Sequence, residues 1–129
     1  MKRKKKTSLE NLIGFQILYM DEEHIVVTKD NQIAVIDIKN EDGGCCGYNI
    51  IEAICEYNYG DKNNPIITKV EKLVGENGDS EICEITFFGK SKAIAYIETT
   101  STSGSGWGYG ATVSISCSTL NINEILSSW

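Results

Sequence analysis

The chain has 129 residues, the length of a single domain, and its 41% hydrophobic and 23% charged residues are ordinary for a globular protein. No apolar run approaches the ~20 residues of a membrane-spanning helix, which argues against a membrane partner. No apolar segment of a signal peptide follows the basic start, so we expect a cytoplasmic protein.

The charge is unevenly distributed. Five of the 12 basic residues lie at positions 2–6, and the rest of the chain carries 7 basic against 18 acidic residues, a net charge of −11. Such an acidic body repels phosphate backbones and argues against nucleic acid as a partner, although the basic tip could touch nucleic acid or an acidic protein.

We expect residues 1–7 to form a disordered basic tail and residues 8–129 a single domain. Arg3 is the only arginine, so an anion site must use lysine or backbone N–H groups.

The first predicted elements form a small antiparallel unit. Residues 8–14 read as one helical turn, with Ser8 as its N-cap and Gly14 as its stop. Residues 15–20, 25–29 and 32–38 are short, β-branched runs joined by polar turns, which predicts a three-stranded meander. Asp37 is expected to face solvent.

A helix and further strands are predicted next. Residues 48–57 place Ile50 and Ile54, and also Ile51 and Cys55, one helical turn apart, which predicts a short helix packed across the meander. Alternating patterns predict strands at residues 66–74, 81–88, 92–100 and 111–117. Residues 120–129 have a weak helical stripe, and the terminal tryptophan could dock on its own chain or on another subunit. The order predicts an α+β domain with one or two antiparallel sheets.

The cysteines divide into two groups. Cys55, Cys83 and Cys117 lie on the apolar phase of their elements and are expected to be small buried side chains. Cys45 and Cys46 are adjacent within the first glycine-rich stretch, residues 42–47. That stretch could approach an anion with its backbone N–H groups, or it could simply be a tight connection whose cysteines fill the core. With one histidine and no Cys-x-x-Cys pair, no metal site and no cofactor are predicted.

The second glycine-rich stretch covers residues 101–110 and alternates glycine with Trp107 and Tyr109. Aromatic rings flanked by glycine and serine can stack on a ring while offering hydrogen bonds. The same pattern would also suit a hairpin whose aromatic residues pack locally or at a subunit contact. Lys90 and Lys92 are the nearest cations in the sequence.

Catalytic patterns are missing from the sequence. His24 is the only histidine and lies in a charged turn, and no Gly-x-Ser-x-Gly elbow, HExxH pattern or Walker loop occurs. We therefore expect a protein that is not an enzyme. A reactive-cysteine or redox role for Cys45 or Cys46 is the remaining chemical alternative.

A family resemblance covers about residues 9–117. Its motifs are residues 12–14 (Leu-Ile-Gly), the Cys45-Cys46 pair, residues 92–94 (Lys-Ala-Ile) and the glycine-aromatic run at residues 104–110. The chain resembles a family of small phage and prophage proteins that is similar to the Thoeris anti-defence proteins of phages. Those proteins bind cyclic nucleotide-type immune signals, notably glycosyl-cyclic ADP-ribose, and assemble as multimers.

The resemblance implies a non-catalytic homo-oligomer in the host cytoplasm that sequesters a nucleotide-derived immune signal, either glycosyl-cyclic ADP-ribose or a cyclic oligonucleotide. Serine and aromatic side chains of the second stretch would shape the pocket, with two lysines meeting phosphate. The expected ligand-binding residues are Ser103, Ser105, Trp107, Tyr109, Lys90 and Lys92. The alternative is an acidic protein–protein inhibitor that covers a basic face of a host nucleic-acid-binding enzyme.

Overall fold

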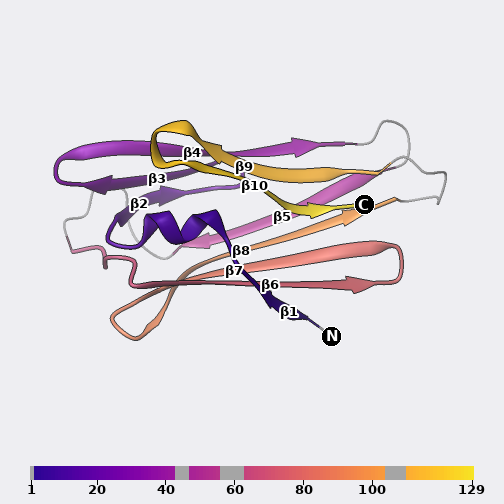
Figure 1. Cartoon of the computed structure of the whole chain (residues 1–129), viewed down its shortest axis with the longest axis horizontal. Coiled ribbons are helices and arrows are strands. Elements are labelled where there is room, and N and C mark those ends of the chain that lie inside the picture. The colour runs from indigo at the N-terminus through magenta and orange to yellow at the C-terminus, as the bar shows by residue number, and fades with distance from the viewer. Residues whose placement is uncertain (1, 43–46, 56–62, 104–109) are drawn as a thin grey trace.

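The chain forms two five-stranded antiparallel sheets that face each other (Figure 1). The computed structural model describes residues 2–42, 47–55, 63–103 and 110–129. Sheet A contains, in spatial order, β1 (Arg3–Lys5), β6 (Lys69–Asn77), β7 (Ser80–Gly89), β8 (Lys92–Thr102) and β5 (Tyr48–Cys55). Sheet B contains β10 (Ile122–Ser128), β9 (Thr112–Cys117), β4 (Gln32–Glu41), β3 (His24–Lys29) and β2 (Gln16–Met20). The two 3-10 helices of the described chain are η1 (Ser8–Leu12) and η2 (Ser118–Leu120).

The architecture corrects the predicted α+β class, because the described residues form a β-sandwich. A helix was predicted at residues 48–57, but residues 48–55 form β5, which completes sheet A by pairing with β8 from Tyr48 opposite Thr102 to Cys55 opposite Ala95. Residues 56 and 57 lie outside the described residues. The prediction rested on apolar pairs spaced by four residues. A spacing of four satisfies the helical period of 3.6 and also the strand period of two, and the three isoleucines of this segment favour a strand.

The C-terminal segment is also a strand where a weak helix was predicted. Ile122 and Leu126 are buried and again four residues apart, and β10 pairs with β9 along sheet B. A bulge between Ile125 and Ser127 shifts the register. Because a bulge moves the following residues to the other phase of the strand, it also blurs the alternation that identifies a strand in sequence.

Most of the remaining predicted elements are confirmed. Strands β2, β3 and β4 are antiparallel neighbours, as expected for the meander, and β6 to β9 lie close to their predicted ranges. The β3–β4 turn has Asp30 and Asn31 at φ 52° and 65°, the conformation of a tight hairpin turn. Asp37 is exposed, as predicted. The short helical turn is confirmed as η1, but its N-cap is Thr7, whose side chain accepts a hydrogen bond from the Leu9 N–H.

A continuous apolar core fills the space between the sheets. Its largest fully buried side chains come from both sheets, from η1 and from the segment before β6, and they are Leu9, Leu12, Ile17, Ile25, Ile36, Ile67, Ile85, Phe87, Ile97, Ile115, Ile122 and Leu126. Cys83 and Cys117 are buried, and Cys55 is half-buried. No helix among the described residues is long and apolar enough to cross a membrane.

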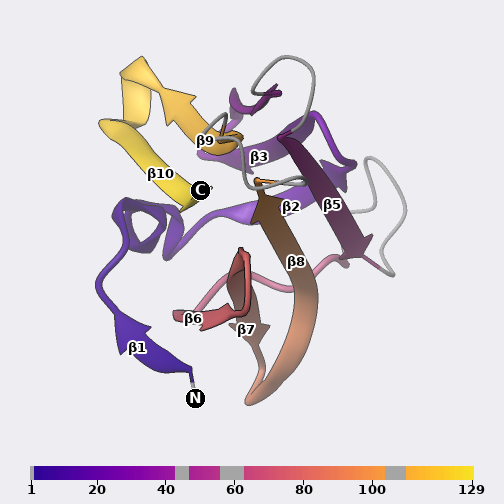
Figure 2. The ribbon, with the colours of Figure 1, turned by 90° about the vertical axis from the view of Figure 1, so that its right-hand side faces the viewer.

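The N-terminal segment, expected as a basic tail, contributes a short strand to sheet A in the structure. Residues Arg3–Lys5 form β1, an edge strand paired with β6, and Figure 2 shows η1 lying between β1 and β10 at the side of the sandwich. The anchor is a buried ionic cluster. Lys72 Nζ on β6 lies 2.6 Å from Oε2 of Glu124 on β10, and Oε1 of the same carboxylate accepts hydrogen bonds from the Thr7 hydroxyl and from the N–H and hydroxyl of Ser8. These contacts fix the chain directly after the lysine run.

Candidate functional site

The described residues that flank the two glycine-rich stretches lie at the same end of the sandwich. In the sequence, residues 42–47 fall between β4 of sheet B and β5 of sheet A, and residues 103–111 fall between β8 of sheet A and β9 of sheet B. Their flanks are paired directly: Glu41 lies opposite Thr112, and Tyr48 lies opposite Thr102. This end of the sandwich, on the right in Figure 1, is called the loop end below.

Asn49 connects the flanks of both stretches. Its Nδ2 donates to Oδ1 of Asn40 at 2.8 Å and also lies within hydrogen-bonding distance of the Glu41 and Thr112 carbonyl oxygens, at 3.2 and 3.1 Å. Its Oδ1 accepts a hydrogen bond of 2.6 Å from the Ser101 hydroxyl. One side chain of β5 therefore holds the ends of β4 and β8 and the start of β9 together.

A buried line of hydroxyl groups continues from Asn49 into the sandwich. The Thr99 hydroxyl donates to Ser127 Oγ at 2.8 Å, and Ser127 Oγ lies 2.7 Å from Ser101 Oγ. Each hydroxyl has one proton, and the Ser101 proton is used for Asn49, so Ser127 donates to Ser101. All three hydroxyl-bearing residues are fully buried. Each hydroxyl therefore donates to the next group in the order Thr99, Ser127, Ser101 and Asn49, so this buried row of hydrogen bonds runs in one direction.

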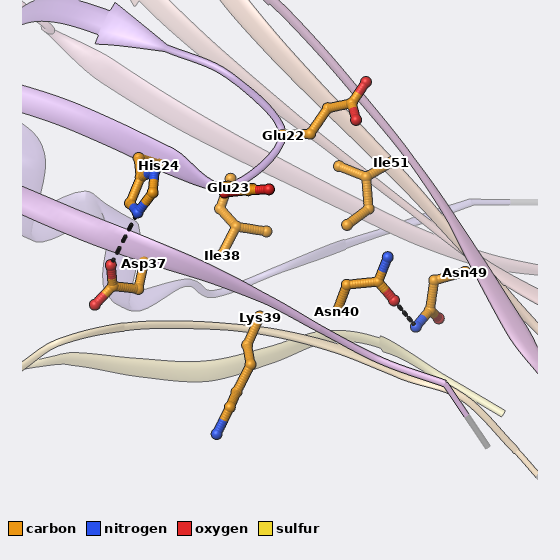
Figure 3. Close-up of a pocket in the computed structure, with 9 residues that line it drawn as sticks. All are labelled: Glu22, Glu23, His24, Asp37, Ile38, Lys39, Asn40, Asn49 and Ile51. Carbon is orange, nitrogen blue, oxygen red and sulfur yellow. Dashed lines mark hydrogen bonds and ion pairs between the residues drawn. The ribbon is translucent and has the colours of Figure 1, made fainter. Parts of the chain in front are cut away.

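A groove of about 460 Å³ runs beside this network (Figure 3). Its walls come from the β2–β3 turn, from β4 and from β5, with Asn40 and Asn49 at the end near the first glycine-rich stretch. The lining residues are Glu22, Glu23, His24, Asp37, Ile38, Lys39, Asn40, Asn49 and Ile51. The groove therefore combines amide, imidazole, carboxylate and ammonium groups with two aliphatic side chains.

The β2–β3 turn that forms one wall is built on Asp21. Its carboxylate accepts hydrogen bonds from the N–H groups of Glu23 and His24, at 2.8 and 2.7 Å, and from the Tyr19 hydroxyl at 2.8 Å. Partial burial alone would raise the pKa of Asp21, but these hydrogen bonds outweigh it and the pKa lies below its ordinary value. Asp21 is therefore an ionised cap that orients the turn.

The histidine of the groove lies between two carboxylates. His24 Nε2 is 3.6 Å from Asp37 Oδ1, and its Nδ1 is 3.9 Å from Asp21 Oδ1. Both distances exceed those of a normal hydrogen bond, and the imidazole is partly exposed. The ring can therefore turn toward a bound molecule without breaking a strong contact.

The predicted ligand-binding residues are only partly described. Ser103 lies at the loop end, where it is buried and its N–H donates to the Asp79 carbonyl. Ser105, Trp107 and Tyr109 lie outside the described residues.

The two predicted lysines lie at the far end of the sheet from Ser103. Lys90 and Lys92 are exposed at the β7–β8 turn, on the left in Figure 1. An 11-residue strand separates them from the loop end, a length of roughly 35 Å. In one chain, a small ligand that contacts Ser103 does not reach Lys90 or Lys92.

The sequence analysis missed the asparagine that connects the loop end. Asn49 was assigned to a helix, where it is one polar residue among several. On a strand, residues 49, 51, 53 and 55 share the inner face, and Asn49 is the polar amide in that set. Strand periodicity in this segment would therefore have identified it. His24 and Asp37 were recognised only as exposed residues of a turn and a strand.

The described residues offer no metal-binding cluster, since no group of three or more histidine, cysteine, aspartate or glutamate side chains could hold an ion there. Cys45 and Cys46 lie outside the described residues. Comparisons of the chain with protein-family models, curated proteins and solved structures find no match.

Proposed function

We propose that this is a non-catalytic cytoplasmic binding protein of a phage or prophage that sequesters a nucleotide-derived immune signal in the groove at the loop end. The observation that carries the proposal is the Asn49 network, which holds the flanks of both glycine-rich stretches beside one polar groove. The resemblance to phage anti-defence proteins supplies the ligand class, either glycosyl-cyclic ADP-ribose or a cyclic oligonucleotide.

The chemistry of the groove suits the sugar and base of such a ligand better than its phosphates. The groove has three carboxylates, from Glu22, Glu23 and Asp37, and one ammonium group, from Lys39. This excess of negative charge disfavours binding of a bare phosphate. Carboxylates accept hydrogen bonds from ribose hydroxyls, and the Asn40 amide is both donor and acceptor. Ile51 offers apolar contact. A ribose-rich ligand would use all of these groups.

The experiment compares two variants that each remove one negative charge. Asp37→Asn changes the groove, while Asp30→Asn changes the β3–β4 turn at the other end of the sandwich. Cyclic ADP-ribose derivatives and cyclic oligonucleotides are screened by thermal shift, and any hit is titrated by calorimetry. We expect Asp37→Asn to weaken binding roughly tenfold, as for loss of one charged hydrogen bond, and Asp30→Asn to leave it unchanged. Equal affinity in both variants would place the ligand elsewhere, and a flat screen would remove the proposal.

An acidic protein–protein inhibitor is the second candidate, and one row of sheet A favours it. Glu52, Glu98 and Glu84 lie directly opposite one another on β5, β8 and β7. Like charges in register destabilise a sheet, and because Lys2 pairs with Glu84, the cost that a basic partner would offset lies at Glu52 and Glu98. A salt-sensitive complex with a basic nucleic-acid-binding enzyme, lost in Glu52→Gln/Glu98→Gln and unaffected by Asp37→Asn, would support this function over the first.

We also propose that the protein self-associates through β5, as the resemblance implies. In the described sheets β5 is an edge strand, and its outer face exposes Tyr48, Ile50 and Ile54 to 49%, 57% and 50%. Exposed edge strands can pair with another chain unless charged side chains, proline or a bulge block them; β5 contains no lysine, proline or bulge among its eight residues, and Glu52 is its single charged side chain.

A further inference from the structure

We propose a second binding site, separate from the loop-end groove, for a small anion that carries two or more phosphate groups. The site is a pocket of about 310 Å³ at the β1 edge of sheet A. Its lining residues are Lys4, Lys5, Lys6, Glu10, Lys69, Val70, Glu71 and Lys72. Below it is called the lysine pocket.

The lysine pocket forms where β1 ends and β6 continues. Strand β1 pairs with β6 from Arg3, opposite Val74, to Lys5, opposite Lys72. Residues 69–71 of β6 therefore extend beyond the end of β1. The chain then passes through Lys6 to η1, which brings Glu10 to the pocket. Lysines from two neighbouring segments therefore surround one hollow.

The lysines are held in place rather than carried on a loose tail. Strand pairing fixes Lys5 from one side, and directly after Lys6 the buried Thr7 is hydrogen-bonded to Glu124. The fully buried Leu9 follows two residues later. A cationic pocket that is already ordered loses less conformational entropy when it binds an anion.

The charge of the pocket is not neutralised within the described chain. Glu71 is shared by Lys4 and Lys69, at 3.5 and 3.4 Å, and Lys72 is paired with Glu124. No described carboxylate forms an ion pair with Lys5 or Lys6. Five lysines and two glutamates line the pocket, and Glu124 neutralises Lys72, which leaves a formal charge of +2 in a chain whose net charge is −6.

Lys5 and Lys72 are also directly opposed across the two strands. Because Lys72 is already paired with Glu124, Lys5 is the member of this pair whose charge is available to a bound anion. Four lining lysines, Lys4, Lys5, Lys6 and Lys69, are not engaged by Glu124, and two phosphate groups can contact more of them at once than a single phosphate can, so a diphosphate suits the pocket better. A long nucleic acid would also meet the rest of the chain, which carries a net charge of −11 outside positions 2–6, so we assign a small anion.

The test measures binding of inorganic pyrophosphate, ADP, adenosine and a single-stranded oligothymidylate by calorimetry at constant ionic strength. Lys5→Gln/Lys6→Gln removes the two unpaired charges, and Lys90→Gln/Lys92→Gln removes two exposed lysines from the β7–β8 turn as the matched control. Lys6→Gln alone is the second variant, because residue 6 lies outside β1 and its substitution does not touch the strand pairing.

We expect pyrophosphate and ADP to bind, adenosine not to bind, and Lys5→Gln/Lys6→Gln to weaken pyrophosphate binding roughly tenfold while the control is unchanged. Affinity should fall as salt is added, since the charges are exposed. Equal losses in both double variants would show general charge attraction and overturn the site, as would tighter binding of the oligonucleotide than of pyrophosphate. Asp37→Asn should leave pyrophosphate binding intact, so the two proposed sites fail or succeed independently.

Discussion

Lys72 on β6 and Glu124 on β10 form a buried ion pair, with 2.6 Å between Nζ and Oε2, that joins the two sheets at the edge covered by η1. Burial alone would raise the pKa of Glu124, but hydrogen bonds from Lys72, Thr7 and Ser8 outweigh it and the pKa lies below its ordinary value of 4.5. The folded chain therefore binds this proton less readily than the unfolded chain, and the ionised carboxylate stabilises the fold.

The first prediction concerns stability against acid. The contribution of Glu124 is fully present well above pH 4.5 and is lost as the pH falls through the lower folded-state pKa. We expect Glu124→Gln to lower the free energy of unfolding by about 1–3 kcal/mol at neutral pH, and to flatten its fall below pH 4.5. Urea denaturation across this pH range measures both effects. Glu22→Gln, an exposed carboxylate, is the control and should leave the profile unchanged; identical profiles for the two variants would contradict the prediction.

The second prediction concerns the Asn49 network. Asn49→Ala removes the amide that joins β4, β5, β8 and β9 and leaves the buried Ser101 hydroxyl without its acceptor. We expect a loss of about 2 kcal/mol or more in the free energy of unfolding, because an unsatisfied buried hydroxyl adds its desolvation cost to the lost hydrogen bonds. Asn123→Ala, at an exposed position of β10, is the matched control. A loss no larger than that of the control would show that the network contributes little.

The sequence predicts an element correctly where the signal is local, and it fails where tertiary contacts determine the structure. The turn at Asp30 and Asn31 and the alternation of residues 111–117 are local signals, and both were predicted correctly. The strand β5 was missed because its apolar spacing fits two periods, and only its pairing with β8 decides between them. Tertiary contacts, which a single sequence does not display, determined that element.

The candidate site was partly predictable for the same reason. The two glycine-rich stretches were singled out because their composition is locally unusual, and the fold brings the flanks of both to one end. Lys90 and Lys92 were chosen for being near Ser103 in sequence, yet an extended strand separates them in space. The lysine pocket depends on β1 pairing with β6, about 70 residues apart, and nothing local to residues 2–6 distinguishes an edge strand from a tail.

The third prediction concerns thiol reactivity. Burial raises the pKa of Cys83 to about 12, so its thiol stays protonated at neutral and mildly alkaline pH. The thiolate is the reactive form, so alkylation of Cys83 should be slow in the native protein and fast after unfolding. Peptide mass spectrometry after a timed iodoacetamide pulse at pH 8, with and without urea, measures this, and Cys55 serves as the half-buried comparison. Native-state labelling of Cys83 as fast as that of Cys55 would contradict the prediction.

The last prediction concerns self-association through β5. Ile50→Lys/Ile54→Lys places two charges on the exposed outer face of this edge strand, where lysine is the residue that natural proteins use to block edge pairing. We expect the wild-type protein to be larger than one chain in light scattering after size exclusion, and this variant to be monomeric. Both substitutions lie on a solvent-facing side, so the fold should persist.

The matched control changes the other exposed apolar face. Ile33→Lys/Val35→Lys introduces the same charges on the outer surface of β4, in the part of that strand that pairs with β3 in sheet B. Its assembly state should equal that of the wild type, because these substitutions lie on the other sheet and leave the β5 edge unchanged. If the β4 variant dissociates and the β5 variant does not, contact occurs face to face through sheet B. A wild-type protein that stays monomeric at every concentration would remove the self-association proposal.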